Sequence, residues 1–197
     1  MNKTIIFDFA GVITTTALFS RVATTLAKKK EIDREFFLNQ MRDHEKQYLI
    51  GKMSTKEFWK KSCENTTISY EEFQKEISYY EINFKILSLI KKLKNKYEIA
   101  ILSDNYEALY DTIKKDKRME NLFQHSFYSH LVQASKMNDE EKIFKLALKE
   151  MQKPPENCIF IDDKEKNLIA PKKMGMQTIH FKRAEQLEKE LEKLEVY

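Results

Sequence analysis

TIIFDFAGVI, the sequence of residues 4–13, decides the fold of this chain. It is an apolar run that ends in the carboxylate of Asp8 and then turns at Gly11. Such a run favours a buried strand of a parallel sheet, and an α/β sheet places its active site at the carboxyl ends of such strands. Asp8 is therefore a candidate nucleophile. Two residues later, where a second carboxylate would be the natural proton donor, the chain has the methyl group of Ala10.

Two further apolar runs end in small or acidic polar residues. Residues 98–102 lead to Ser103-Asp104-Asn105, and residues 158–161 lead to Asp162-Asp163. If the three runs are neighbouring parallel strands, their polar ends meet at one edge of the sheet. Weaker candidates for two more strands are residues 126–128 and 177–181.

Amphipathic stretches separate these runs. Apolar residues at helical spacing, with charged residues opposite, predict helices over residues 84–97, 139–151, 164–174 and 184–195. Gly175 follows the third of these stretches and is a candidate C-cap. Strands that alternate with helices predict an α/β fold with a doubly wound parallel sheet.

Residues 14–82 have a different pattern, with no apolar run that ends in a polar group. Helical blocks are expected over residues 17–29, 33–49, 55–64 and 70–78. Ser54 with Glu57, and Ser69 with Glu72, match the capping box that starts a helix. We therefore predict a core made of residues 1–13 and 83–197, with a small helical cap domain, residues 14–82, inserted after the first strand.

The composition excludes several classes of protein. The 197 residues carry 35 basic and 31 acidic side chains, a net charge of +4, so no strong basic surface for nucleic acid is expected. Cys63 and Cys158 are too few and too far apart for a disulfide framework or a zinc site. No apolar run reaches the ~18 residues of a membrane span, and the N-terminal run is too short for a signal peptide. We expect a soluble cytoplasmic protein, either a monomer or a homodimer.

The acidic residues indicate a metal site. Asp8, Asp162 and Asp163 at one sheet edge would repel one another and would not all stay ionised without a cation. Mg2+ suits such a site because it takes a few carboxylates, a carbonyl oxygen and waters. A carboxylate such as Asp8 can then attack phosphorus and form an aspartyl-phosphate. Ser103 offers a hydroxyl donor to the phosphoryl oxygens, and Lys136, before a predicted helix, offers a balancing charge.

Taken together and in order, these residues resemble the four motifs of the haloacid dehalogenase-like (HAD) superfamily. The matching stretches are residues 5–12, 101–105, 136–144, and 159–167 with the later 174–176. The helical insert after the first motif resembles the helical cap of that superfamily. Residues 51–59, GKMSTKEFW, look like the cap turn of its sugar-phosphate phosphatase branch, which includes bacterial glucose-1-phosphate phosphatases.

The resemblance implies a metal site and a nucleophile. Asp8 would be both the nucleophile and a ligand of Mg2+. The main-chain carbonyl of Ala10 would be a second ligand, which a methyl side chain does not remove. Asp163 would bind Mg2+ directly, with Asp162 beside it directly or through water.

The resemblance also implies a phosphate site. Ser103 and the main-chain amides that follow it, beginning at Asp104, would hold the phosphate. Lys136 would neutralise charge on the nucleophile and the phosphate, and Asn167 would orient the acidic loop. Asp104 stands where the superfamily more often has Asn.

Ala10 leaves three functions open. Most phosphatases of the superfamily have an acid at this position, and general acid–base catalysis typically contributes ~10²–10⁴ in rate. The first function is a Mg-dependent phosphatase for a small phosphorylated metabolite, slowed or restricted in substrate by Ala10. The second is a weak or inactive HAD-like binding protein. The third, a haloacid dehalogenase, uses no metal, so Asp162 and Asp163 argue against it.

Overall fold

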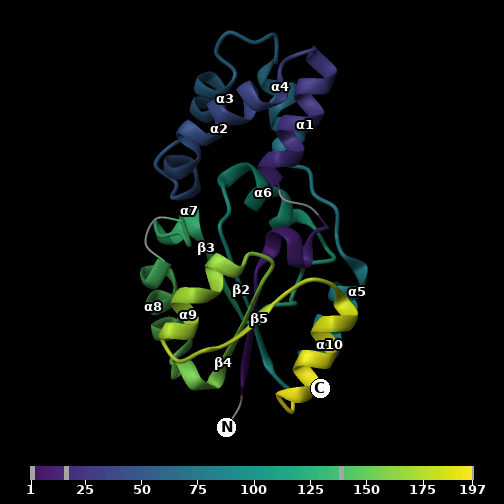
Figure 1. The fold of residues 1–197 in the computed structure, drawn as a ribbon, viewed down its shortest axis with the longest axis vertical. Coiled ribbons are helices and arrows are strands. Elements are labelled where there is room, and N and C mark those ends of the chain that lie inside the picture. The colour runs from purple at the N-terminus through teal and green to yellow at the C-terminus, as the bar shows by residue number, and fades with distance from the viewer. Residues whose placement is uncertain (1–2, 16–17, 138–139, 197) are drawn as a thin grey trace.

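The computed structural model describes residues 3–15, 18–137 and 140–196, and its centre is a five-stranded parallel sheet (Figure 1). The strands lie in the order β3-β2-β1-β4-β5. Their bounds are Thr4–Phe7 for β1, Glu98–Ser103 for β2, His125–Tyr128 for β3, Cys158–Asp162 for β4 and Gln177–His180 for β5. The predicted α/β fold is confirmed, including the two strands for which the sequence signal was weak.

The register of the sheet aligns the ends of its central strands. Phe7 pairs with Ile101 of β2 on one side and with Ile161 of β4 on the other. The amide of Asp8 donates to the carbonyl of Ile161 at 2.9 Å, so the ladder continues one residue past the strand. The residues that follow β1, β2 and β4 therefore emerge at the same edge.

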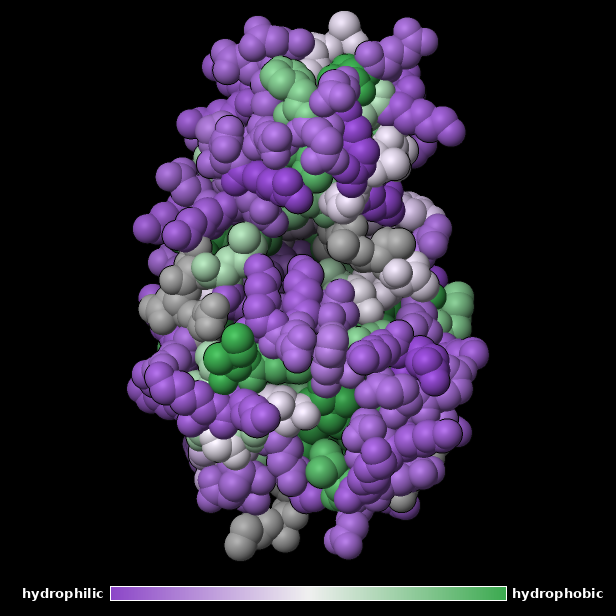
Figure 2. Space-filling view, viewed as in Figure 1, coloured by the Kyte–Doolittle hydropathy of each residue, from purple (hydrophilic) through white to green (hydrophobic). Residues whose placement is uncertain are grey.

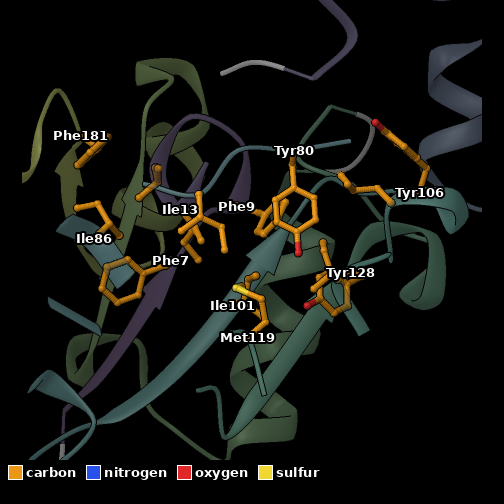
Figure 3. Close-up of a cluster of buried hydrophobic side chains, with 14 of the residues drawn as sticks. Phe7, Phe9, Ile13, Tyr80, Ile86, Ile101, Tyr106, Met119, Tyr128 and Phe181 are labelled. Carbon is orange, nitrogen blue, oxygen red and sulfur yellow. The ribbon is translucent and has the colours of Figure 1, made fainter. Parts of the chain in front are cut away.

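Helices cover both faces of the sheet, because successive strand side chains point to opposite faces. Ile5 and Phe7 face α5 (Phe84–Leu93), α6 (Glu107–Lys115) and α10 (Ala184–Lys193), and Figure 3 shows part of this layer. Ile6 faces the other way, in a second apolar cluster with residues of α8 (Glu140–Met151) and α9 (Ile169–Lys173). The sheet is thus doubly wound, with an apolar layer on each side.

The inserted segment forms four helices beyond the carboxyl end of the sheet, at the top of Figure 1. These are α1 (Leu18–Lys30), α2 (Arg34–Leu49), α3 (Thr55–Ser62) and α4 (Tyr70–Ile77). Both predicted capping boxes are present, with Ser54 and Glu57 at the start of α3 and Ser69 and Glu72 at the start of α4. We call these four helices the cap.

The cap shares one apolar cluster with the core. The ring of Tyr48 in α2 stacks between Phe58 of α3, at 4.2 Å between centroids, and Tyr106 of the core, at 4.9 Å. The hydroxyl of Tyr106 donates to the carbonyl of Ile77 in α4 at 3.0 Å. Apolar side chains of the cap therefore pack directly against the core.

Some helices differ from the sequence prediction. α5 and α10 are shorter than predicted, and the stretch 164–174 begins as a tight turn over Glu165–Leu168 before α9. Pro171 has no amide hydrogen to donate to the preceding turn, which explains this late start. Gly175 ends the stretch at φ +97°, as expected for a C-cap. Position 139 of the predicted helix 139–151 lies outside the described residues. None of the described helices is long and apolar enough to cross a membrane.

Candidate active site

The turn after β1 places Asp8 at the sheet edge. Asp8 is buried, and its Oδ1 accepts from the amide of Phe9 at 2.7 Å. The amide of Thr14 closes the turn on the carbonyl of Phe9 at 2.9 Å. Gly11 adopts φ +85°, and a Cβ atom there would lie 2.4 Å from Oδ2 of Asp163. Glycine is therefore required both by the backbone and by the close approach of the acidic loop.

Three carboxylates converge at this edge. Oxygen atoms of Asp8, Asp162 and Asp163 all lie within 4.8 Å of one another. Asp162 and Asp8 are buried, and Oδ1 of Asp163 is buried with no hydrogen-bond partner among the described residues. Three oxygen ligands this close, one of them unpartnered, form a donor set that fits a hard divalent cation such as Mg2+.

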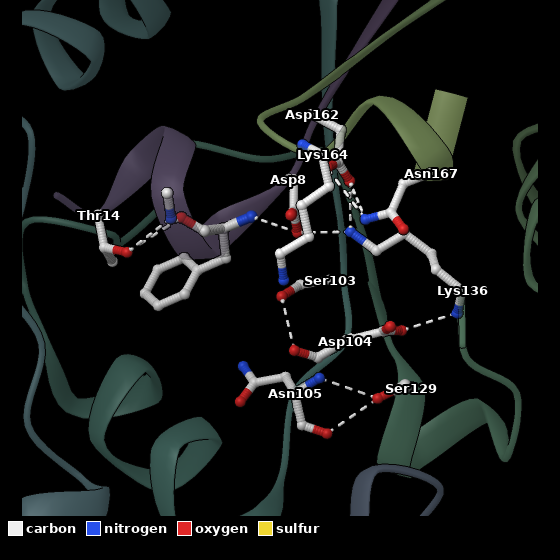
Figure 4. A network of polar contacts seen from close by, with 12 residues as sticks. Asp8, Thr14, Ser103, Asp104, Asn105, Ser129, Lys136, Asp162, Lys164 and Asn167 are labelled. Atoms are coloured by element: carbon white, nitrogen blue, oxygen red, sulfur yellow. Dashed lines mark hydrogen bonds and ion pairs between the residues drawn. The ribbon is translucent and has the colours of Figure 1, made fainter. Parts of the chain in front are cut away.

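Lys136 lies between two of these carboxylates (Figure 4). Its Nζ is 2.9 Å from Oδ1 of Asp8 and 2.7 Å from Oδ2 of Asp162, and the side chain is buried. Burial works against its charge, but the carboxylates of Asp8 and Asp162 outweigh it and raise the pKa of Lys136. Lys136 is therefore a cation held against Asp8.

Asp162 is held in place from three sides. Asn167 donates to both of its carboxylate oxygens at 3.0 Å, and the amide of Lys164 donates to Oδ1 at 2.8 Å. Burial alone would raise the pKa of Asp162, but Lys136 and these donors outweigh it, so the pKa is lowered. Asp162 stays ionised and orients Lys136.

The pKa values of Asp8 and Asp163 are raised, in contrast to that of Asp162. Burial raises the pKa of Asp8, and the charge of Asp162 adds to this, while Lys136 opposes it. Burial also raises the pKa of Asp163. One buried lysine does not balance three carboxylates, so a bound cation would remove a real electrostatic cost.

The end of β2 supplies the other side of the site. Ser103 is buried, with its Oγ 3.4 Å from the carbonyl of Asp104. Oδ1 of Asp104 accepts from the amide of Lys136 at 2.9 Å and so positions the segment that carries the lysine. Burial raises the pKa of Asp104. The amide of Asn105 donates to Oγ of Ser129 at 2.9 Å, which fixes the turn after β2.

A cavity of about 310 Å³ lies between this edge and the cap. Ala10, Asp104 and Asn167 line it from the core, and Met41 and Glu45 of α2 line it from the cap. Figure 2 shows this face of the molecule hollowed between the cap helices and the core. Ala10 thus borders this cavity at the turn that follows Asp8.

Three residues near this site were not singled out from the sequence. Lys164 directly follows the acidic pair, and its charge acts to lower the pKa of Asp8. Ser129 follows β3, and its Oγ donates to the carbonyl of Leu49 in the cap at 2.6 Å. A polar residue after each strand is a signal that could have found both. Glu45 lies on the inward face of α2, four residues from Met41 and from Leu49, and a carboxyl group within that apolar stripe is the signal that could have found it.

The sequence matches one family model, described as "Hydrolase: haloacid dehalogenase-like hydrolase", over residues 2–175. Among curated proteins, the rat (Rattus norvegicus) bifunctional epoxide hydrolase 2 is 32% identical over 136 residues. That match covers 66% of this chain but only 24% of the length of the rat protein.

Solved structures share the fold. A predicted HAD-like family hydrolase from Porphyromonas gingivalis has a TM-score of 0.80 at 20% identity, covering 100% of this chain and 99% of that one. A HAD family enzyme from Bacteroides thetaiotaomicron, solved in complex with magnesium and inorganic phosphate, has a TM-score of 0.71 at 21% identity. That match covers 92% of this chain and 95% of the other.

Proposed function

The chain belongs to the haloacid dehalogenase-like hydrolases, and from this we propose that it is a Mg2+-dependent phosphatase acting on a small phosphorylated metabolite. The observation that carries the proposal is the group of buried Asp8, Asp162 and Lys136 with half-buried Asp163, beside a cavity of metabolite size. The Bacteroides thetaiotaomicron enzyme, which binds magnesium and inorganic phosphate, supports it as a relative in fold.

Asp8 acts as the nucleophile in this proposal. Its carboxylate attacks phosphorus, the bond to the leaving oxygen breaks, and an aspartyl-phosphate forms on Asp8. Lys136, 2.9 Å from Oδ1, favours the ionised form of the buried carboxylate, against the effect of burial, and balances the charge that the phosphate brings. Water then attacks the phosphorus, which releases phosphate and restores Asp8.

The metal would be held by Asp8, Asp163, the main-chain carbonyl of Ala10 and Asp162, the last directly or through water. When bound, Mg2+ supplies positive charge that draws the phosphate to the nucleophile and stabilises the transition state. Asn167 and the amide of Lys164 keep Asp162 oriented for this. Ser103 and the amides that begin at Asp104 would bind the phosphoryl oxygens.

The sugar-phosphate branch remains a prediction about the substrate. It rests on the sequence of residues 51–59. Gly51 in that stretch packs closely against the core, because a Cβ atom there would lie 2.4 Å from the carbonyl oxygen of His130. Gly51 therefore helps the cap to pack on the core. The substrate is therefore best sought with a panel of phosphorylated sugars, nucleotides and cofactors.

A dehalogenase is the weaker alternative. Such an enzyme needs no metal and has no use for three carboxylates within 4.8 Å of one another. A binding protein without turnover is the other alternative, and Ala10 is the observation that favours it.

The test is hydrolysis of p-nitrophenyl phosphate by the purified protein with Mg2+. We expect turnover that EDTA abolishes and that Mg2+ restores. Asp8→Asn should reduce kcat/KM by at least about 10³-fold, since it removes the nucleophile. Asp43→Asn, at an exposed position of α2, is the matched control and should keep full activity. Full activity in Asp8→Asn would exclude the mechanism.

A further inference from the structure

Two carboxyl groups lie among the described residues that line the cavity. Asp104 comes from the core and Glu45 from α2 of the cap. Asp104 already accepts a hydrogen bond from the amide of Lys136. Among the described residues, Glu45 makes no ion pair and no hydrogen bond, although cations line the same cavity. Glu45 is thus a partly buried carboxyl group without a structural partner there.

Glu45 and Ala10 border the same space. Ala10 occupies the position, two residues after the nucleophile, where an acid would protonate the leaving group, and its methyl leaves that room to the cavity. We propose that Glu45 is the general acid of this enzyme, supplied by the cap in place of the side chain that Ala10 lacks. This inference rests on the proposed phosphatase function.

The proton balance of the two steps is complete. As Asp8 attacks phosphorus, the protonated carboxyl of Glu45 gives its proton to the leaving oxygen, which departs as an alcohol. The resulting Glu45 carboxylate then takes a proton from the water that attacks the aspartyl-phosphate. Phosphate leaves, Asp8 is regenerated and Glu45 is again protonated.

The surroundings of Glu45 suit this role. Burial raises the pKa of Glu45 and outweighs Lys164 and Arg42, which lower it; Asp104 raises it further and Lys166 lowers it. Among the described residues, the lining also includes Tyr106, whose hydroxyl donates to the carbonyl of Ile77. A phosphate dianion in the cavity would raise the pKa of Glu45 again, since it adds negative charge.

Two substrates of nearly equal size separate acid catalysis from other effects. The leaving group of p-nitrophenyl phosphate needs little protonation, whereas that of phenyl phosphate needs much more. Glu45→Gln should lower kcat/KM for phenyl phosphate by about 10²-fold and that for p-nitrophenyl phosphate by less than about threefold. We compare kcat/KM because it reports formation of the aspartyl-phosphate and not its hydrolysis.

The pH profile gives a second readout. For phenyl phosphate, kcat/KM should fall as the pH rises through the raised pKa of Glu45, because the proton donor is lost. This alkaline limb should be absent in Glu45→Gln. Ala10→Asp in the Glu45→Gln background should restore most of the lost kcat/KM for phenyl phosphate, and Asp43→Asn should change neither substrate.

Each outcome decides a different claim. Equal losses on both substrates in Glu45→Gln, or no loss on either, would overturn the role of Glu45 while the wild-type activity upheld the phosphatase. If Asp104→Asn lost kcat/KM selectively for phenyl phosphate while Glu45→Gln did not, the proton donor would be Asp104, and the role of Glu45 would again be overturned. No metal-dependent hydrolysis by the wild type would overturn the proposed function and this inference together.

Discussion

At the scale of single residues, Oδ1 of Asp163 stands out among the carboxylate oxygens of the candidate site. It is buried without a hydrogen-bond partner among the described residues, and Gly11 leaves room for its neighbour Oδ2. A buried, unpartnered carboxylate oxygen costs stability unless a cation binds it. The glycine and the acid are therefore best explained as two parts of one metal site.

Mg2+ should stabilise the folded protein. At about 100 times its Kd, a ligand that binds only the folded state adds ≈ 2.7 kcal/mol, which is about 5–10 °C in Tm for a chain of this size. Asp163→Asn should lose most of this shift, because it removes a charged ligand and keeps the shape. Thermal unfolding with and without Mg2+ measures it. A full shift in Asp163→Asn would exclude this carboxylate as a ligand.

The same measurement has a predicted pH dependence. Burial raises the pKa of Asp8 and of Asp163 above their usual range. When the pKa of a carboxyl group is higher in the folded than in the unfolded state, the fold loses stability as the pH rises above the unfolded-state pKa. Below the folded-state pKa, a proton on the carboxyl group competes with the metal. The shift caused by Mg2+ should therefore be larger at about pH 8 than at about pH 6. The opposite trend would contradict the assignment.

At the scale of elements, the capping boxes fix where the cap helices begin. The amide of Ser54 donates to Oε2 of Glu57 at 2.8 Å, and the amide of Glu57 donates to Oγ of Ser54 at 3.3 Å. α3 begins here, and Thr55 next to Ser54 contacts Glu107 of α6 with its hydroxyl at 3.1 Å. The start of α3 therefore also fixes how the cap meets the core.

Ser54→Ala should lower the free energy of unfolding by ~1 kcal/mol, because it removes the N-cap acceptor. Ser54→Thr keeps a hydroxyl at the same position and should cost only a few tenths of that amount. Denaturant unfolding of both variants, with the slope m unchanged, provides the measurement. Equal stability in Ser54→Ala and the wild type would mean that the capping box contributes nothing.

Sequence patterns find elements that carry their own signal. The strands could be predicted because apolar runs end in polar residues, and α3 and α4 because their caps are local. α6 begins at Glu107 after Tyr106, which makes no side-chain cap hydrogen bond, so its start has no such signal. Asp8 and Asp162 could be expected together because parallel strands end at one edge, whereas Lys136 was expected from the need for a balancing charge and from the resemblance. Glu45 shares a helix face with Met41 and Leu49, but only the packing of α2 on the core places the cavity opposite that face, and no local pattern encodes this packing.

At the scale of the whole molecule, the cap and the core are joined by packing as well as by the chain. The cluster around Tyr48, Phe58 and Tyr106 crosses the boundary between them. Where the chain leaves and re-enters the core, Thr14 pairs with Ile82 and the amide of Asn83 donates to the carbonyl of Ile13 at 2.8 Å. Separating the cap from the core would therefore expose apolar side chains of both parts to water.

Cap and core should therefore unfold together. Trp59 is the single tryptophan and lies in α3, so its fluorescence reports the cap, whereas far-UV circular dichroism reports all helices and strands. We expect the two transitions to coincide in denaturant, as they do in two-state unfolding. A tryptophan transition that precedes the dichroism transition would show that the cap unfolds alone.

The central claim, that Asp8 carries the phosphoryl group, has a direct test. The wild-type protein is mixed with p-nitrophenyl phosphate and Mg2+, quenched in acid during the first turnovers, digested, and analysed by mass spectrometry. The proposed mechanism predicts a phosphoryl group on the peptide that contains Asp8, present in the wild type and absent in Asp8→Asn. Release of p-nitrophenol at the full rate while that peptide stays unmodified throughout would contradict it.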